Sequence, residues 1–237
     1  MFLILLSCYN CVPMGLDNKV KNLPKYTFRD EIWNSITHGI GFLFSLGVLV
    51  YFIVINVVRS IHFTVMAPYY FYVFSMMLVF VISTLYHSSK FSTKYRAIMR
   101  IIDHSDIYLF CAGTYFPICM FGVMPHNVGI ALVITQFALA TFGILTVAIP
   151  NNSKVLKALG YVCYIIEGWI LVFFLPFGVT LNFTVFLFVL IGGIVYTIGA
   201  IIYAIGKKKI WLHTVFHVFV VLGAVLQFVG IYFLINL

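Results

Sequence analysis

Charged residues are scarce in this sequence. Asp, Glu, Lys and Arg make up 8% of its 237 residues, whereas soluble domains carry about 25%. Hydrophobic residues make up 63%, and the mean hydropathy is +1.11. A water-soluble fold so poor in charge would have too few polar groups for its surface. The composition therefore excludes a soluble domain and predicts an integral membrane protein.

Paired cysteines and a leader segment are not indicated either. The chain has five cysteines, an odd number, and Cys111, Cys119 and Cys163 lie in apolar stretches, which argues against a disulfide framework. The apolar run at residues 1–6 follows no positively charged region and is too short to span a bilayer, so it makes a poor signal peptide. We expect residues 1–30 to form a cytoplasmic or interfacial segment and residues 31–237 to form one membrane domain.

Long apolar stretches are what the sequence has in abundance. A helix needs about 20 predominantly apolar residues to cross a bilayer. Seven stretches reach that length, at residues 36–58, 67–88, 101–123, 128–149, 156–177, 181–205 and 211–235. The connections between them are too short for a soluble domain. The pattern predicts an all-α protein, a bundle of seven transmembrane helices.

The Lys and Arg residues predict the direction of these helices. Thirteen of the fourteen lie before the first stretch or in alternate connections: Lys19, Lys21, Lys25, Arg29, Lys90, Lys94, Arg96, Arg100, Lys154, Lys157, Lys207, Lys208 and Lys209. Only Arg59 lies on the opposite side. Because cytoplasmic loops carry an excess of Lys and Arg, we expect a cytoplasmic N-terminus and an external C-terminus. The same bias explains the net charge of +8 without a nucleic-acid partner, since basic loops face anionic lipid headgroups.

Ionisable groups inside membrane helices are costly and usually functional, and here several share one depth. Ser83 and His87 lie four residues apart at the end of the second stretch. Asp103 opens the third stretch, and His213 and His217, also four apart, open the seventh. Residues four apart share a helix face. In the topology inferred from the cations, all these positions lie at the cytoplasmic side, so their side chains are expected to meet.

Three neutral histidines and a water molecule are the ligands of a catalytic zinc site. Zinc lowers the pKa of such a water to about 7. We therefore predict a zinc site formed by His87, His213 and His217 near the cytoplasmic face. Asp103 would orient the water or act as a general base. Ser83, one turn deeper than His87, would hold the water or orient a carbonyl group.

Simpler interpretations exist for each of these residues. An HxxxH pair often arises by chance on a helix, and His87 alone could extend toward the headgroups. Asp106 could serve either the site or a helix–helix hydrogen bond, and Glu167 is better explained as an interhelical polar contact. A further polar helix face receives no assigned role; it carries Glu31, Asn34 and His38.

Four strings in this order resemble the hemolysin III family: DEIWNSITHGIG, STLYHS, DHSDIYLFCAGTYFPI and HTVFHVFVVLGA. That family is related to the progestin and adipoQ receptors, which include the adiponectin receptors. The resemblance implies seven helices with a cytoplasmic N-terminus and zinc bound by His87, His213 and His217. It also implies that Asp103 contacts the zinc-bound water and that Ser83 belongs to the site. A wider superfamily that contains alkaline ceramidases shares these residues, which implies hydrolysis of lipid amides.

Three functions follow as hypotheses. The first is a zinc-dependent hydrolase of lipid amides or esters, whose substrate enters from the bilayer. The second is a pore-forming cytolysin, as the family name suggests, although the sequence shows no polar pore lining. The third is a receptor-like membrane protein in which a structural zinc ion holds the helices together.

Overall fold

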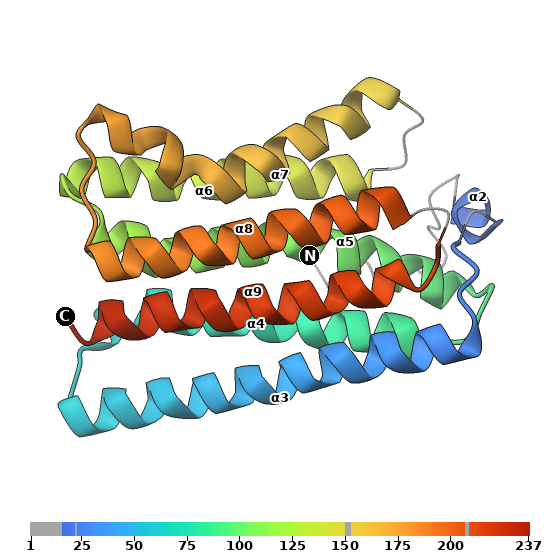
Figure 1. Cartoon of the computed structure of the whole chain (residues 1–237), viewed down its shortest axis with the longest axis horizontal. Helices are drawn as coiled ribbons and strands as arrows, with labels where there is room; N and C mark the ends of the chain where they lie inside the picture. The colour runs from blue at the N-terminus through green and yellow to red at the C-terminus, as the bar shows by residue number, and fades with distance from the viewer. Residues whose placement is uncertain (1–15, 22, 150–152, 207–208) are drawn as a thin grey trace.

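The computed structural model describes residues 16–21, 23–149, 153–206 and 209–237, which are almost entirely helical (Figure 1). Predictions about the first fifteen residues, Lys207 and Lys208 lie outside the described residues. The longer helices are α3 (Phe28–Arg59), α4 (Phe63–Ser88), α5 (Lys94–Pro117), α6 (His126–Ala148), α7 (Lys154–Phe174), α8 (Phe183–Ile205) and α9 (Leu212–Ile235). The shorter ones are α2 (Leu16–Lys21), the π-helical turn η1 (Ile118–Gly122) and the 3-10 turn η2 (Leu175–Phe177). The prediction of an all-α protein is confirmed.

Six of the described helices are long and apolar enough to cross a membrane. They are α3, α4, α6, α7 with η2, α8 and α9. The remaining predicted span, residues 101–123, corresponds to α5 and η1 and does not meet this criterion, because α5 carries charged side chains through its first half. These are Lys94, Arg96, Arg100, Asp103 and Asp106. The structure therefore supports an all-α membrane protein with six strongly apolar helices.

Helix α3 begins at Phe28, well before the predicted residue 36. The Thr27 hydroxyl accepts a hydrogen bond from the Asp30 backbone N–H at 3.2 Å, and the Asp30 carboxylate accepts one from the Thr27 N–H at 3.2 Å. This reciprocal capping box fixes the start of the helix. Hydropathy could not locate that start because the first turns are polar. The earlier start places Glu31 and Asn34 inside the helix, on its buried face.

Helix α5 also begins before its predicted first residue, and this corrects the interpretation of Arg96. We expected Arg96 to be a loop cation facing lipid headgroups. Its side chain is instead completely buried, at 0% exposure. The guanidinium carbon lies 4.7 Å from the centroid of the Tyr86 ring and 4.5 Å from that of the Phe91 ring. Because arginine is almost never fully buried unless it is paired, this position requires a partner inside the bundle.

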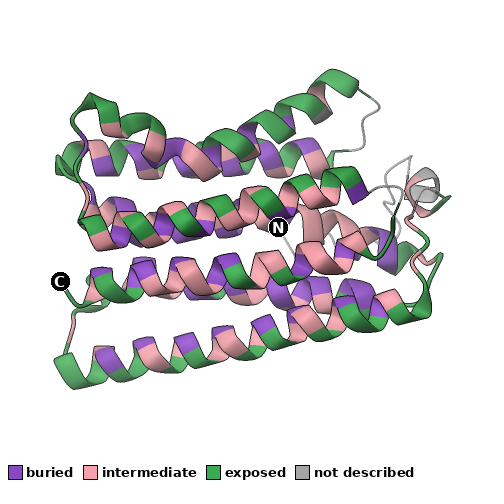
Figure 2. Ribbon diagram, viewed as in Figure 1, coloured by how far each residue is buried: buried purple, intermediate pink, exposed green. Residues whose placement is uncertain are grey.

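Helices that are adjacent in sequence pack against each other along most of the chain, and α9 contacts both α8 and α3. The exception is the pair α7 and α8, which touch far less than their neighbours do. Figure 1 shows the start of α7 well away from the end of α8. Buried residues gather on the inward faces of the helices, and the outward faces are exposed (Figure 2). The exposed side chains on these outward faces are largely apolar, as lipid contact requires.

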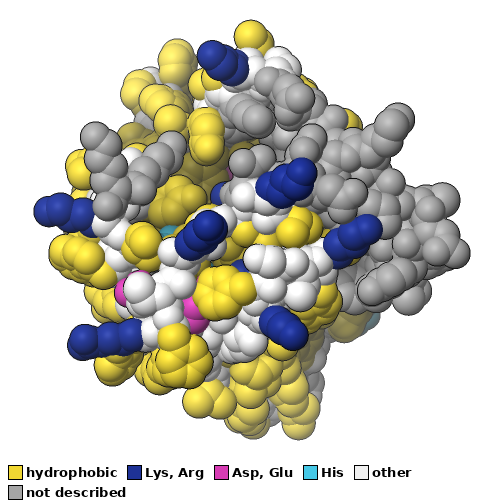
Figure 3. Space-filling model, turned by 90° about the vertical axis from the view of Figure 1, so that its right-hand side faces the viewer, with side chains coloured by type: hydrophobic (Ala, Val, Ile, Leu, Met, Phe, Trp, Pro, Cys, Tyr) yellow, Lys and Arg dark blue, Asp and Glu magenta, His cyan; other side chains and the backbone are white. Residues whose placement is uncertain are grey.

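The two ends of the bundle differ in charge. The starts of α3, α5 and α9 and the end of α4 lie at the right-hand end of Figure 1, and Lys and Arg side chains are spread over this end in Figure 3. Its exposed cations include Lys21, Lys25, Arg29, Lys90, Lys94, Lys154 and Lys209. At the other end, Arg59 donates hydrogen bonds to the Ile235 backbone oxygen at 3.1 Å and to Asn236 Oδ1 at 2.6 Å.

Candidate metal centre

Three histidines from two helices converge at the cationic end of the bundle. His87 lies in the last turn of α4, and His213 and His217 lie in the first two turns of α9. His213 Nε2 is 3.3 Å from His87 Nε2 and 3.1 Å from His217 Nε2. One nitrogen from each ring lies within 4.8 Å of the other two, and all three residues are buried. The structure thus brings together the residues that the sequence assigns to a metal.

The second nitrogen of each ring shows which atoms are free to bind a cation. His217 Nδ1 lies 3.3 Å from the Asn34 backbone oxygen. A carbonyl only accepts, so Nδ1 carries the proton. His87 Nδ1 lies 2.6 Å from Glu31 Oε2 and donates to that carboxylate. In neutral rings the Nε2 atoms of His87 and His217 then present lone pairs, whereas His213 Nδ1 is buried without a hydrogen-bond partner among the described residues. These lone pairs face one shared space, where a cation relieves their mutual repulsion.

The spacing of the nitrogens suits zinc. Four ligands at the usual Zn–N length of 2.0–2.1 Å, arranged as a tetrahedron, stand about 3.3 Å apart. The two Nε2–Nε2 distances above, 3.3 and 3.1 Å, agree with that value. Among the described residues, no fourth His, Cys, Asp or Glu joins the group. The residues present therefore could hold a metal ion, and these two spacings are compatible with zinc.

A cavity of about 1100 Å³ extends from the histidines into the bundle. His213 and His217 line it, together with the predicted site residues Ser83 and Asp103. Ser83 is buried, and its side chain neighbours the Asp103 carboxylate. The Asp103 carboxylate also contacts His104, whose Nδ1 lies 3.3 Å from Asp103 Oδ2. Ser83 and Asp103 thus line the same cavity as His213 and His217.

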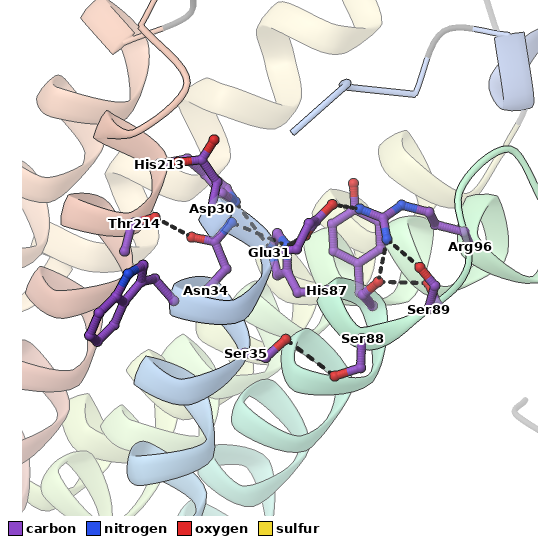
Figure 4. A network of polar contacts seen from close by, with 12 residues as sticks. Asp30, Glu31, Asn34, Ser35, His87, Ser88, Ser89, Arg96, His213 and Thr214 are labelled. Carbon is purple, nitrogen blue, oxygen red and sulfur yellow. Dashed lines mark hydrogen bonds and ion pairs between the residues drawn. The ribbon is translucent and has the colours of Figure 1, made fainter. Parts of the chain in front are cut away.

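The polar face of α3, for which the sequence predicts no role, contacts the histidines, and Figure 4 shows Glu31 and Asn34 beside His87. Besides contacting His87, Glu31 forms an ion pair with Arg96 of α5. Asn34 Oδ1 accepts a hydrogen bond from Thr214 Oγ1 at 2.6 Å. The His38 ring stacks on His217 with centroids 3.8 Å apart. The spacing of three and then four residues along α3 signalled one shared face, but it did not say what that face would contact.

The segment before α3 covers the histidines from the cationic end. The Tyr26 ring stacks on His213, with centroids 4.9 Å apart, and meets His87 edge-on at 5.6 Å. Burial raises the pKa of the Tyr26 hydroxyl well above its ordinary value, so the group stays protonated. Lys19 and Leu23 line the cavity as well, and Lys19 Nζ donates to the Val147 backbone oxygen at 3.4 Å.

The other two acidic candidates lie apart from this group. Asp106 and Glu167 are both buried, and their carboxylate oxygens have no hydrogen-bond partner within the described chain. Neither belongs to the histidine group. Glu167 does contact another helix, but through its backbone: the Gln136 side chain donates from Nε2 to the Glu167 carbonyl oxygen at 2.8 Å. The interhelical side-chain contact expected for Glu167 is therefore not seen.

Comparison with known proteins places these residues in a family. The model of a family described as haemolysin-III related matches residues 26–228. The chain is 34% identical over 209 residues to a hemolysin-3 homolog of Bacillus subtilis (strain 168), over 88% of this chain and 95% of that protein. It is 35% identical over 208 residues to hemolysin-3 of Bacillus cereus, over 86% and 91% of the two chains. The chain belongs to the haemolysin III family.

Membership of the haemolysin III family confirms the resemblance drawn from the four strings. Together with the six apolar helices, it identifies a multi-pass integral membrane protein. The matched range begins at Tyr26 and includes His87, His213 and His217. The polar cluster and its aromatic cover therefore lie within the haemolysin III region of the chain.

Proposed function

We propose that this haemolysin III protein is a zinc-dependent hydrolase of lipid amides or esters. The observation that carries the proposal is the position of three converging Nε2 atoms at one end of a large cavity inside the membrane domain. Zinc held by three neutral imidazoles supplies Lewis acidity and a water whose pKa is lowered to about 7. Hydrolysis of an amide or ester needs these two capabilities close to a bound carbonyl group.

Asp103 and Ser83 supply the proton and hydrogen-bond chemistry. Asp103 accepts a proton from the attacking water and then delivers it to the leaving amine or alkoxide. Ser83 donates a hydrogen bond to the carbonyl oxygen, on which negative charge develops during attack. Their shared position on the cavity wall beside His213 and His217 supports these roles. Asp103 is not counted among the metal ligands, which leaves its carboxylate available for proton transfer.

The size and lining of the cavity favour a lipid substrate. Its volume of about 1100 Å³ slightly exceeds the 300–1,000 Å³ usual for small-molecule sites. Much of the wall is apolar or aromatic, including Ile107, Phe110, Tyr164, Ile165, Phe216 and Val220. Because α7 and α8 contact each other so little, a chain from the bilayer could enter between them. A single-chain or N-acylated lipid would place its carbonyl beside the histidines and its tail along this wall.

We further infer seven spans, with the N-terminus in the cytoplasm. In Figure 1, α4 and α6 both run from the left-hand end to the right-hand end. Helix α5 connects the end of α4 to the start of α6, so it must cross the same distance in the opposite direction. Its charged residues then face the bundle interior rather than lipid. Labelling of single cysteines placed beside Lys90 and beside His126 tests this topology, since only the first is expected to react from the cytoplasmic side.

The decisive experiment on the hydrolase compares Asp103→Asn with Asp106→Asn, two substitutions of the same kind on one helix. Purified protein is assayed for zinc content and for hydrolysis of fluorescent N-acyl sphingosine and acyl-ester lipids. We expect Asp103→Asn to keep its zinc and to lose roughly 100-fold or more in hydrolysis, the range of a lost general base. Wild-type hydrolysis in Asp103→Asn, or none in the wild-type protein with its zinc bound, would refute the hydrolase.

A lytic function is the alternative, because a relative from Bacillus cereus carries the name hemolysin-3. Dye release from liposomes separates the two proposals. A protein in which His87, His213 and His217 are all replaced by Ala should lose zinc and hydrolysis together. If that variant still releases dye as the wild type does, lysis is independent of the metal centre, and the lytic function takes precedence.

A further inference from the structure

A glutamate and an arginine outside the histidine group join three helices around it. The Glu31 carboxylate of α3 contacts His87 Nδ1 of α4 through Oε2, at 2.6 Å, and contacts an Arg96 guanidinium nitrogen of α5 through Oε1. Both side chains that flank Glu31 are fully buried, and the carboxylate itself is 6% exposed. The two oxygens of one carboxylate therefore serve one partner each, away from bulk water.

Arg96 is fixed in place independently of Glu31. Its second terminal nitrogen donates to the backbone oxygens of Tyr86 at 3.1 Å and Ser89 at 2.6 Å. These carbonyls flank His87 at the end of α4, where helix carbonyls have no partner within the helix. The Tyr86 oxygen also accepts hydrogen bonds from the Ser89 N–H and hydroxyl, so the guanidinium adds to the bonds that close the end of α4. It also balances the charge of the Glu31 carboxylate, which contacts His87. Hydrogen bonds of this charged kind are roughly twice as strong as neutral ones.

The consequence for His87 concerns its tautomer and its ring orientation. A histidine that donates its Nδ1–H to a carboxylate keeps the lone pair on Nε2 and becomes a more basic ligand. His87 Nε2 is the atom that faces His213 Nε2. Glu31 therefore selects the productive tautomer, and its ion pair with Arg96 fixes the orientation of the carboxylate. Asn34, also on α3, does the same for His217 of α9. Its backbone oxygen lies 3.3 Å from His217 Nδ1 and accepts the proton of that nitrogen.

We propose that Glu31, held by Arg96, is a positioning residue that sets the metal affinity of the histidine centre through His87. This inference rests on the proposed metal centre but not on the hydrolase activity. It differs from a purely structural role of the ion pair, which would hold α3, α4 and α5 together without changing how tightly an ion binds. The two possibilities differ in what they predict for the melting temperature of the metal-free protein and for its zinc affinity.

The test measures zinc affinity of the full-length purified protein by competition with a chromophoric chelator, beside the melting temperature of the metal-free protein. Glu31→Gln keeps the size of the side chain and removes its charge. We expect a 10- to 100-fold weaker zinc affinity, the usual effect of losing a carboxylate behind a metal-bound histidine. Glu167→Gln removes another buried glutamate, outside the cluster, and should leave the affinity unchanged.

Two further measurements keep the inference open to refutation. Arg96→Lys retains the charge, but the shorter group cannot reach Glu31 and both carbonyls together. As a single substitution it should weaken zinc binding. Added to Glu31→Gln, it should weaken zinc binding little further. Cobalt(II) provides a second probe, and its absorption spectrum should shift in Glu31→Gln. If Glu31→Gln does not fold, Arg96→Lys decides by the same measurement.

The outcomes are distinct. A lower melting temperature with wild-type zinc affinity would show a structural ion pair and overturn the inference. A wild-type protein that binds neither zinc nor cobalt would overturn the inference and the metal centre together. Weakened zinc affinity in Glu31→Gln, without lipid hydrolysis by any variant, would uphold the inference while the hydrolase fails.

Discussion

The rings of Tyr26 and His213 stack with their centroids 4.9 Å apart and an angle of 22° between their planes. Tyr26 belongs to the segment before α3, while His213 lies in the first turn of α9. A residue far away in sequence thus covers one of the three converging nitrogen donors at the end of the bundle that carries the cations. We expect this ring to limit access to the histidines from that end.

Removal of the Tyr26 ring should therefore speed the exchange of a bound ion. We expect zinc to leave Tyr26→Ala at least several-fold faster than it leaves the wild type when excess EDTA is added. Tyr26→Phe keeps the stacked ring and serves as the matched control, with a wild-type rate. Stopped-flow detection of released zinc measures both. Equal rates for Tyr26→Ala and the wild type would show that the ring does not limit access.

Loss of one histidine should abolish the centre. His213→Ala leaves two nitrogen donors, and its zinc affinity should fall by more than the roughly 10- to 100-fold expected from a supporting residue. His126→Ala changes an exposed histidine at the start of α6 and is the control. Metal analysis of both purified variants decides. Stoichiometric zinc in His213→Ala at wild-type affinity would mean that the ion lies elsewhere.

The cavity can be narrowed without touching the polar cluster. Gly193 lines the cavity, and a Cβ atom placed there meets no other atom within 4 Å. Gly193→Leu should fill part of the space and reduce hydrolysis of long-chain lipids by about tenfold or more relative to short-chain ones, since fit in an apolar pocket discriminates on that scale.

Gly47→Leu is the matched control for this change, because Gly47 also has open space around it but lies on an exposed face of α3. Zinc content should be unchanged in both proteins. Chain-length profiles that coincide for Gly193→Leu and the wild type would exclude this cavity as the lipid site.

A glycine tests the packing of the fold itself. A Cβ atom at Gly129, near the start of α6, would overlap the backbone oxygen of Cys119. Gly129→Ala should therefore destabilise the protein by about 1–3 kcal/mol, as overpacked cores do. Gly39→Ala, where nothing lies within 4 Å, should be neutral or slightly stabilising. Thermal unfolding in detergent compares the two, and a stable Gly129→Ala protein would contradict the close approach of η1 and α6.

The metal group was predictable because two independent patterns agree on it. The distribution of the cations indicates that the end of α4 and the start of α9 lie at the same membrane depth. The spacing of four residues indicates that His213 and His217 lie on the same face of α9. The chemistry of Ser83 and Asp103 then pointed to the same region, and both line the cavity beside the histidines. These inferences needed only periodicity, direction and depth.

Glu31 and Arg96 could not be assigned in the same way. Arg96 was counted with the basic loops, because its sequence neighbours are polar and a buried guanidinium is recognisable only by its partners. Those partners come from α3 and from the end of α4. Hydropathy also placed the start of α3 too late, since a helix that begins with a capping box and polar turns resembles a loop in composition. The sequence of a single helix therefore does not predict contacts that involve α3, α4 and α5 together.

The three histidines lie far apart in the sequence, and His213 follows His87 by 126 positions. During synthesis, α4 enters the membrane long before α9 exists. A chain that stops short of α9 holds one of the three nitrogen donors and cannot assemble the centre. A bound metal ion would therefore indicate that synthesis has passed α9, and it would link α4 to this later-made helix.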